Sequence, residues 1–339
     1  MSKKVNLSLD QVYDLSFQVL SKFGLSDAHA GAIARVIFAG ERDECISHGV
    51  YRLGVLAHTI QQNHVSKTAE PLIIVDETSI VKVDAQYAFS PLAFEKSVEQ
   101  LAIKTKQMGI AALQINHCYH FSALWPEVEA IAAYGLVGLA MTPSHAWVTP
   151  AGGNSPVLGT NPLAFSWPRE HAENPYVFDF ATSAIARGDL ELHHRTNTDL
   201  PDNVAIDKEG NITKDAKAAM DGGSMLTFGG YKGSALSTMI ELMSGSLIED
   251  LTSQESLKLD DGQKCTPCHG ELLLAFDPSK FGLGNIAKSE ASAEQLFKSI
   301  VGQGARLPSQ RRFEARKRSH EKGVFISEHI YSEIQMLLK

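Results

Sequence analysis

The chain has 339 residues, 44% of them hydrophobic and 21% charged, which is typical of a soluble globular enzyme with about two domains and a substantial core. Its formal net charge of -8 argues against sequence-independent binding to nucleic acid, which needs a basic surface. Residues 1–10 lack a secretory signal and no run of about 18 apolar residues could span a membrane, so we expect a cytoplasmic protein without a membrane partner.

The first part of the chain has the signals of successive helices. Ser8 opens a capping box before an apolar repeat that ends at Gly24, and Ser26 caps a second helix. We expect the second and third helices at about 28–43 and 50–63.

A polar corner lies between these two helices and holds Ser47, His48 and Arg52. Ser47 can hold or relay a proton, His48 can donate one near neutral pH, and Arg52 can bind a carboxylate through two parallel hydrogen bonds. A small substrate with a carboxylate at one end and a protonatable atom at the other would fit this trio. By itself, the stretch is explained at least as well by a polar helix junction.

Strands and helices alternate after Pro71. Apolar runs predict strands, and helical periodicity predicts helices. We expect strands at 72–75, 80–83, 109–115, 136–141, 162–166, 176–181 and 271–277, helices at 93–106, 235–248 and 292–302, and an irregular surface segment at 200–221. The mixture predicts an α/β or α+β fold with helical segments at both ends.

Two polar turns are candidates for binding an anion. Residues 116–124 join a predicted strand to a helix, whose first backbone N–H groups attract negative charge. Gly229, Gly230 and Gly233 let a backbone approach a ligand closely, and Lys232 adds a positive charge.

The usual motifs of nucleotide binding and serine hydrolysis are missing. The chain has no Gly-x-Gly-x-x-Gly, no P-loop spacing and no Gly-x-Ser-x-Gly, which disfavours a Rossmann fold, a P-loop nucleotidase and a serine hydrolase. Cys265, Cys268 and His269 match the pattern of c-type haem attachment. Without an export signal or a second pair of zinc ligands, we interpret them as part of a loop, and we expect no metal site among the histidines.

Several segments, in the right order, resemble the type-2 malate/L-lactate dehydrogenase family. They are Ser47–Gly49 with Arg52, His120–Leu124, Gly159–Pro162, Asp179–Ser183 and Phe228–Gly233. The resemblance covers about residues 8–320. It implies an NAD(P)-binding fold distinct from Rossmann, with a largely antiparallel sheet, and a homodimer. The implied regions are 1–70 with 303–339, a helical substrate and dimer region, and 71–302, an α/β region for NADP binding and catalysis.

Within the family, residues 120–129 and 186–189 look like the Δ1-piperideine-2-carboxylate/Δ1-pyrroline-2-carboxylate reductases. Malate- and lactate-type members typically have a His-Phe-Gly segment and often a lysine at the place of Asp189. The resemblance therefore implies NADPH-dependent reduction of cyclic imino acids to L-pipecolate or L-proline. The alternatives are a malate/L-lactate-type 2-hydroxy-acid dehydrogenase and an inactive relative that only binds ligands.

The resemblance also implies residue roles. Ser47, His48 and Asp189 would form a proton relay, while Arg52 and Thr160 would bind the substrate. The implied cofactor contacts are His120, Phe121, Ser122, Ala123, Leu124, Phe178, Asp179, Phe180, Arg187, Gly229 and Gly230, with Arg306, Arg311 and Arg312 near the phosphates.

Overall fold

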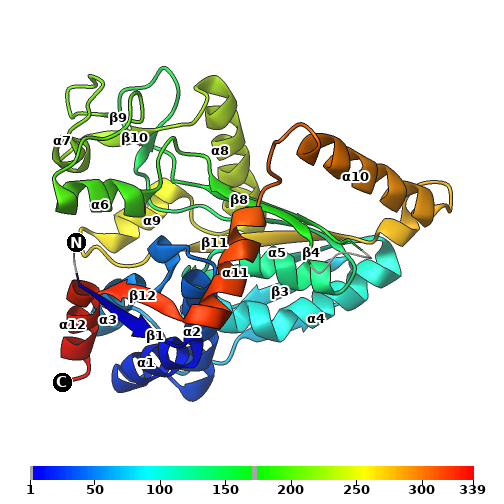
Figure 1. The fold of residues 1–339 in the computed structure, drawn as a ribbon, viewed down its shortest axis with the longest axis horizontal. Coiled ribbons are helices and arrows are strands. Elements are labelled where there is room, and N and C mark those ends of the chain that lie inside the picture. Colours follow the sequence, from blue (N-terminus) through cyan, green and yellow to red (C-terminus); the bar gives the residue numbers. More distant parts are fainter. Residues whose placement is uncertain (1–2, 170–173) are drawn as a thin grey trace.

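A seven-stranded sheet forms the centre of the protein in the computed structural model, which describes residues 3–169 and 174–339 (Figure 1). In spatial order, its strands are β2 (Leu72–Val75), β3 (Ile80–Asp84), β4 (Ile110–Tyr119), β11 (Cys268–Phe276), β5 (Val137–Met141), β7 (Pro162–Trp167) and β8 (Tyr176–Ala181). Among the described strands of this seven-stranded sheet, only β3 and β4 pair in parallel. The expected mixed fold with a largely antiparallel sheet is therefore observed.

Helices cover both faces of this sheet. α4 (Ser90–Met108) and α5 (Leu124–Ala133) pack on one face, where Leu113, Ile115 and Leu273 are fully buried. α8 (Tyr231–Ser244) and the short 3-10 helix Ser246–Ile248 contact the other face through Ile240 and Ile248. Side chains alternate between the two faces along each strand, so neighbouring residues of β11 enter different cores.

The two ends of the chain pack together. β1 (Lys4–Leu7) pairs antiparallel with β12 (Val324–Ser327), a two-stranded sheet that the sequence did not reveal. The helices around it are α1 (Leu9–Lys22), α2 (Asp27–Arg42), α3 (Leu53–Gln61), α11 (Gln310–Lys322) and α12 (Glu328–Leu337). The Ser8 capping box is confirmed, and α1, α2, α3 and α12 share one hydrophobic core.

A smaller sheet with its own core lies above the central one in Figure 1. It consists of β6 (Val148–Thr149), β10 (Ser224–Leu226) and β9 (Ala205–Ile206), and the helices near it are α6 (Arg187–Thr196), α7 (Ala216–Met220) and α9 (Ser253–Asp260). The prediction that 200–221 is irregular was therefore wrong, since this segment contains β9 and α7. The segment is rich in polar residues, and both elements are too short to show a hydrophobic period in the sequence.

Several element bounds also differ from the prediction. The third helix begins as a 3-10 turn, Val50–Arg52, before α3. α8 begins at Tyr231 because Gly230, with φ of 60°, forms its cap. α10 (Ile286–Val301) begins earlier than expected and stands apart from the body of the protein (Figure 1). Among the described residues, no helix is both long and apolar enough to cross a membrane.

Candidate active site

The corner that holds Ser47, His48 and Arg52 consists of two consecutive 3-10 turns, Ile46–His48 and Val50–Arg52. The buried carboxylate of Glu41 in α2 anchors this corner, because its Oε1 accepts the N–H of Val50 at 2.8 Å. A Cβ at Gly49 would lie 2.0 Å from that same oxygen, so only glycine fits between the turns. Ser47 Oγ lies 3.2 Å from His48 Nδ1, which confirms that the predicted pair is in hydrogen-bond contact.

Arg52 is a partly buried cation that lacks a full set of partners. Its guanidinium lies 5.6 Å from the centre of the Phe121 ring, and its Nε has no hydrogen-bond partner among the described residues. Burial lowers the pKa of Arg52, and the nearby Glu191 opposes this effect. A guanidinium withdrawn from water needs an anionic partner. This arrangement fits a site for a substrate carboxylate.

His48 is neutral in the free protein. Burial, and then the charge of Arg52 and the neighbouring His120, lower the pKa of His48 to about 3. The expectation that His48 donates a proton near neutral pH is therefore corrected for the free protein. The edge of its ring meets Trp125, with ring centres 5.6 Å apart, so α5 fixes its orientation.

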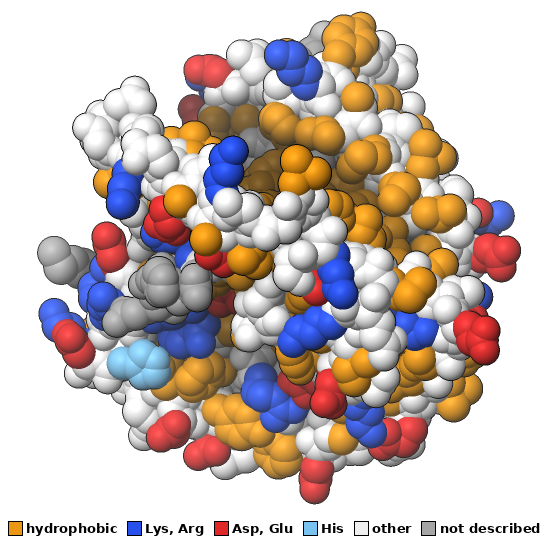
Figure 2. All heavy atoms as spheres, turned by 90° about the vertical axis from the view of Figure 1, so that its right-hand side faces the viewer, with side chains coloured by type: hydrophobic (Ala, Val, Ile, Leu, Met, Phe, Trp, Pro, Cys, Tyr) orange, Lys and Arg blue, Asp and Glu red, His pale blue; other side chains and the backbone are white. Residues whose placement is uncertain are grey.

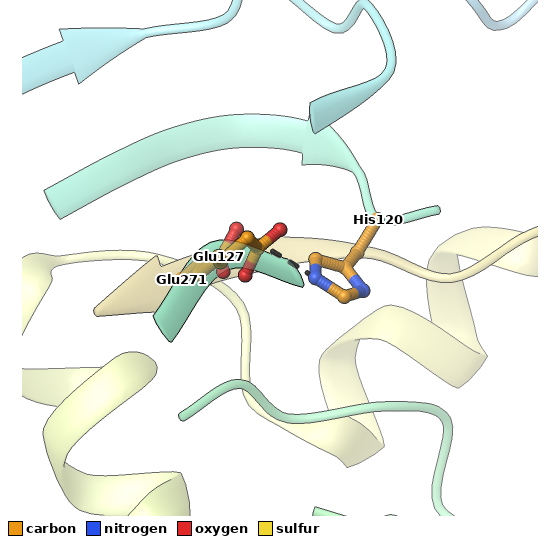
Figure 3. A group of neighbouring side chains, drawn as sticks. All are labelled: His120, Glu127 and Glu271. Carbon is orange, nitrogen blue, oxygen red and sulfur yellow. Dashed lines mark ion pairs between the residues drawn. The ribbon is translucent and has the colours of Figure 1, made fainter. Parts of the chain in front are cut away.

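A second buried group lies next to this corner and comprises His120, Glu127 and Glu271 (Figure 3). His120 Nε2 is 3.6 Å from Glu271 Oε2, and a ligand atom of each residue lies within 4.8 Å of the others. Burial and the charge of Arg52 lower the pKa of His120 to about 4. Sequence reasoning missed both glutamates, and the one signal that could have pointed to either is that Glu271 precedes the apolar run Leu272–Phe276 of β11.

The segments predicted to contact the cofactor converge around the start of α5. The carboxylate of Asp179 in β8 accepts the backbone N–H of Trp125 at 3.0 Å, and burial raises the pKa of Asp179 to about 6. Phe180 meets Phe228 with ring centres 5.8 Å apart, which brings β8 beside the turn at Gly229 and Gly230. Both glycines have positive φ, which requires glycine for conformational reasons.

Arg312 completes this cluster from α11. Its guanidinium lies 5.3 Å from the centre of the Trp125 ring, and the side chain is buried. Its Nε and Nη2 have no hydrogen-bond partner within the described part of the chain. By contrast, Arg306 and Arg311 are exposed. Arg312 is therefore the residue of the basic segment whose surroundings best fit a bound anion.

The remaining predicted residues are placed differently. The carbonyl of Thr160 accepts the backbone N–H of Thr182 at 2.8 Å. The side-chain Nδ2 of the next residue, Asn161, donates to Glu241 Oε1 at 2.8 Å. Asp189 is exposed in the first turn of α6, and no hydrogen bond among the described residues joins it to Ser47 or His48. A Cβ at the preceding Gly188 would lie 3.4 Å from Ser47, so the start of α6 does border the corner.

Arg187 contacts two neighbouring side chains, Glu191 and Trp147. Its Nε lies 3.2 Å from Glu191 Oε1, and its guanidinium lies 4.7 Å from the centre of the Trp147 ring. Glu191 also accepts the Tyr51 hydroxyl at 2.9 Å. Arg187 thus helps to fix α6 against the corner through Glu191 and Tyr51.

The Cys265–His269 segment belongs to the core. Cys265 and Cys268 are free thiols and are buried, and Cys268 begins β11. His269 Nδ1 lies 3.0 Å from the Thr142 hydroxyl. The interpretation of this segment as a loop was wrong at its second half, where the residues are in the central sheet.

Comparisons with known proteins identify the family of this chain. The family model described as malate/L-lactate dehydrogenase matches residues 7–335. The Δ1-pyrroline-2-carboxylate reductase of Pseudomonas fluorescens is 56% identical over 338 residues, covering 100% of both chains. The Δ1-pyrroline-2-carboxylate/Δ1-piperideine-2-carboxylate reductase of Pseudomonas aeruginosa is 50% identical and covers 99% of this chain and 100% of its own.

Solved structures extend the comparison. The crystal structure of Δ1-piperideine-2-carboxylate reductase from Pseudomonas syringae has a TM-score of 0.91 and 36% identity, covering 98% of this chain and 99% of that one. Malate dehydrogenase from Entamoeba histolytica has a TM-score of 0.89 at 22% identity, covering 99% and 97% of the two chains, which shows a shared fold.

Proposed function

The chain belongs to the malate/L-lactate dehydrogenase family, and we propose that it reduces cyclic α-imino acids with a nicotinamide cofactor. Relatives that are 47% to 57% identical carry the name Δ1-pyrroline-2-carboxylate reductase. The proposed reactions convert Δ1-pyrroline-2-carboxylate to L-proline and Δ1-piperideine-2-carboxylate to L-pipecolate. Within the structure, the observation that carries this function is the under-partnered Arg52 beside the Ser47–His48 pair. Comparing cofactor oxidation with these imines and with 2-keto acids tests it.

Arg52 selects the substrate by its carboxylate. A charge-assisted pair with Arg52 would orient the flat ring, with Thr160 lining the pocket. The apolar part of the ring contributes little to selection, because one methylene gives only about 1–3 kcal/mol of discrimination. Five- and six-membered imines are therefore both expected to react.

The protonation of the ring nitrogen involves His48. A nicotinamide cofactor supplies the hydride that C2 of the C=N bond receives, and the nitrogen must gain a proton to become a secondary amine. Binding of the substrate carboxylate neutralises Arg52, whose charge is one cause of the low pKa of His48. The bound substrate thus removes one of the causes that lower the pKa of His48, while burial, the larger cause, remains. Ser47 and Asp189 would link His48 to water at the start of α6.

NADPH is the proposed form of the cofactor. The turn 120–124, Phe178–Phe180 and the glycines Gly229 and Gly230 would border the nicotinamide half. The open nitrogens of Arg312 would bind a phosphate, with the exposed Arg306 and Arg311 nearby in the chain. Buried donors without partners support this assignment, because such groups are rare unless a ligand satisfies them.

A homodimer is the proposed assembly, with 1–70 and 303–339 as the helical region and 71–302 as the cofactor region. The surface offers apolar area for a second copy on α8 and the 3-10 helix after it, where Met239, Leu242 and Leu247 are 37%, 57% and 64% exposed. Figure 2 also shows hydrophobic side chains gathered in a hollow in the upper part of one face. Large apolar surfaces of this kind usually mark interaction sites.

Replacement of Leu242 by Glu is expected to convert the dimer to monomers, because a carboxylate would be buried at the contact. Light scattering coupled to size-exclusion chromatography measures the molecular mass in solution. Leu283→Glu is the matched control, because Leu283 is another exposed leucine, and this variant should stay dimeric. A wild-type protein that elutes as a monomer would contradict the proposed assembly.

A further inference from the structure

Two glutamates meet in the core beneath the candidate active site. Glu271 lies on the face of β11 that Leu273 and Ala275 share, and Glu127 lies in the first turn of α5. The register of β11 against β4 shifts between His269 and Glu271, which is a bulge of the kind that redirects side chains. Both carboxyl groups are buried, with Glu271 fully so and Glu127 3% exposed.

The surroundings of this pair do not allow two negative charges. Within the described residues, none of its four oxygens has an ideally placed hydrogen-bond partner, although Glu271 and the Ser122 hydroxyl lie close enough to Glu127 to lower its pKa, and no Lys or Arg forms an ion pair with the two glutamates. The titratable groups around the pair are His120, His269, Cys118, Asp179 and, beyond His120, Arg52. Burial, and then Glu127, raise the pKa of Glu271 well above its usual value. Two adjacent buried carboxyl groups therefore do not both ionise, and Glu271 is the one that keeps its proton.

His120 connects this pair with the active site. Its side chain is 10% exposed, and its Nε2 lies 3.6 Å from Glu271 Oε2 without a hydrogen-bond partner. The other ring nitrogen, Nδ1, points away from both carboxyl groups (Figure 3). His120 stacks on His269 with ring centres 5.4 Å apart, and the next residue, Phe121, contacts Arg52.

A neutral imidazole carries its proton on one nitrogen only, so the hydrogen bond at one nitrogen decides the state of the other. When Glu271 is protonated, it donates to Nε2, and the proton of His120 stays on Nδ1. When both glutamates are ionised, Nε2 must donate to Glu271, and Nδ1 becomes an acceptor.

We propose that Glu127 and Glu271 are positioning residues: Glu127 helps to keep Glu271 protonated, and the Glu271 hydroxyl donates a hydrogen bond to Nε2 and holds His120 with its own proton on Nδ1, as a hydrogen-bond donor toward the cofactor and substrate. This role rests on the proposed function and concerns the orientation of groups around the reacting atoms. It predicts a loss of turnover at high pH, where Glu271 gives up its proton.

Two isosteric substitutions separate this role from simple packing, because they act in opposite directions. In Glu271→Gln, the amide can donate to Nε2 and imitates the protonated acid. We expect kcat within about threefold of wild type, with the alkaline loss of activity removed. In Glu127→Gln, the negative charge that helps to keep the proton on Glu271 is lost. Because burial alone still favours the neutral acid, we expect kcat near wild type at neutral pH, with the alkaline loss of activity moved to lower pH and the substrate KM little changed.

Nitrogen-15 NMR of His120 gives a readout that does not depend on turnover. The expected result is a proton on Nδ1 in wild type and in Glu271→Gln, whereas in Glu127→Gln the proton moves to Nε2 at a lower pH than in wild type. Asp250→Asn is the matched control, since Asp250 is a partly buried carboxylate outside the cluster that accepts the N–H of His117 at 2.7 Å. The Asp250→Asn variant should have a lower melting temperature than wild type and an unchanged pH dependence of kcat.

An equal pH dependence of the tautomer or of kcat in the two glutamine variants would overturn the proposal. A stoichiometric divalent metal in the purified protein, lost in Glu271→Gln, would also overturn it and identify the cluster as a metal site. If wild type binds NADPH but reduces no cyclic imine, the proposed function fails, while the NMR comparison still tests the role of the pair.

Discussion

Replacement of His48 by Ala is expected to lower kcat for Δ1-pyrroline-2-carboxylate by about 10²–10⁴-fold, the usual contribution of a positioned acid or base. His48 contacts Ser47 Oγ at 3.2 Å and lies beside Arg52, so its loss removes the proton path nearest the substrate carboxylate. Cofactor affinity should stay within about twofold, because the predicted cofactor contacts lie on other segments. Steady-state kinetics and a fluorescence titration with NADPH measure both quantities.

His329→Ala is the control for this variant, since His329 is an exposed histidine of α12 that pairs only weakly with Glu333, at 3.7 Å. It should keep wild-type kcat. Wild-type turnover in His48→Ala would remove His48 from the mechanism, and loss of NADPH binding there would assign it to the cofactor site instead.

Replacement of Arg52 by Met is expected to raise the KM for the imino acid at least about 30-fold, while the KM for NADPH changes little. Removing one partner of a buried charge pair typically costs about 2–5 kcal/mol. Met keeps the apolar contact with Phe121 and removes only the charge and its donors. Arg52→Lys should be intermediate, because an ammonium cannot form two parallel hydrogen bonds to a carboxylate.

Arg35→Met serves as the control, because Arg35 is an exposed arginine that forms an ion pair with Glu95 on another surface. It should leave both KM values unchanged. Equal increases in the KM of imino acid and NADPH in Arg52→Met would mean that Arg52 does not hold the substrate carboxylate.

The elements of the central sheet were the most predictable part of the fold. β8 coincides with the predicted strand 176–181, and β2 with 72–75, because each is an apolar run bounded by turn residues. β4 continues beyond its predicted end through His117, which has a positive φ of 50° at the bulge. The pairing of β1 with β12 was not predictable, since it joins two short strands from opposite ends of the chain.

The candidate site was predictable where neighbours in sequence are also neighbours in space. Ser47 and His48 are in contact, and the contact of Arg52 with Phe121 joins two of the predicted segments. Glu127 and Glu271 were missed because each has an ordinary sequence context, and only the packing of α5 on β11 brings them together. Burial raises the pKa of both carboxyl groups, and the sequence does not show whether a single polar residue is buried.

The most direct test of the proposed function is a comparison of substrates with purified protein and both nicotinamide cofactors. We expect oxidation of NADPH with Δ1-pyrroline-2-carboxylate and Δ1-piperideine-2-carboxylate, a slower rate with NADH, and little reaction with pyruvate or oxaloacetate. Oxidation of NADPH with pyruvate or oxaloacetate but with neither cyclic imine would contradict the account and identify a 2-hydroxy-acid dehydrogenase.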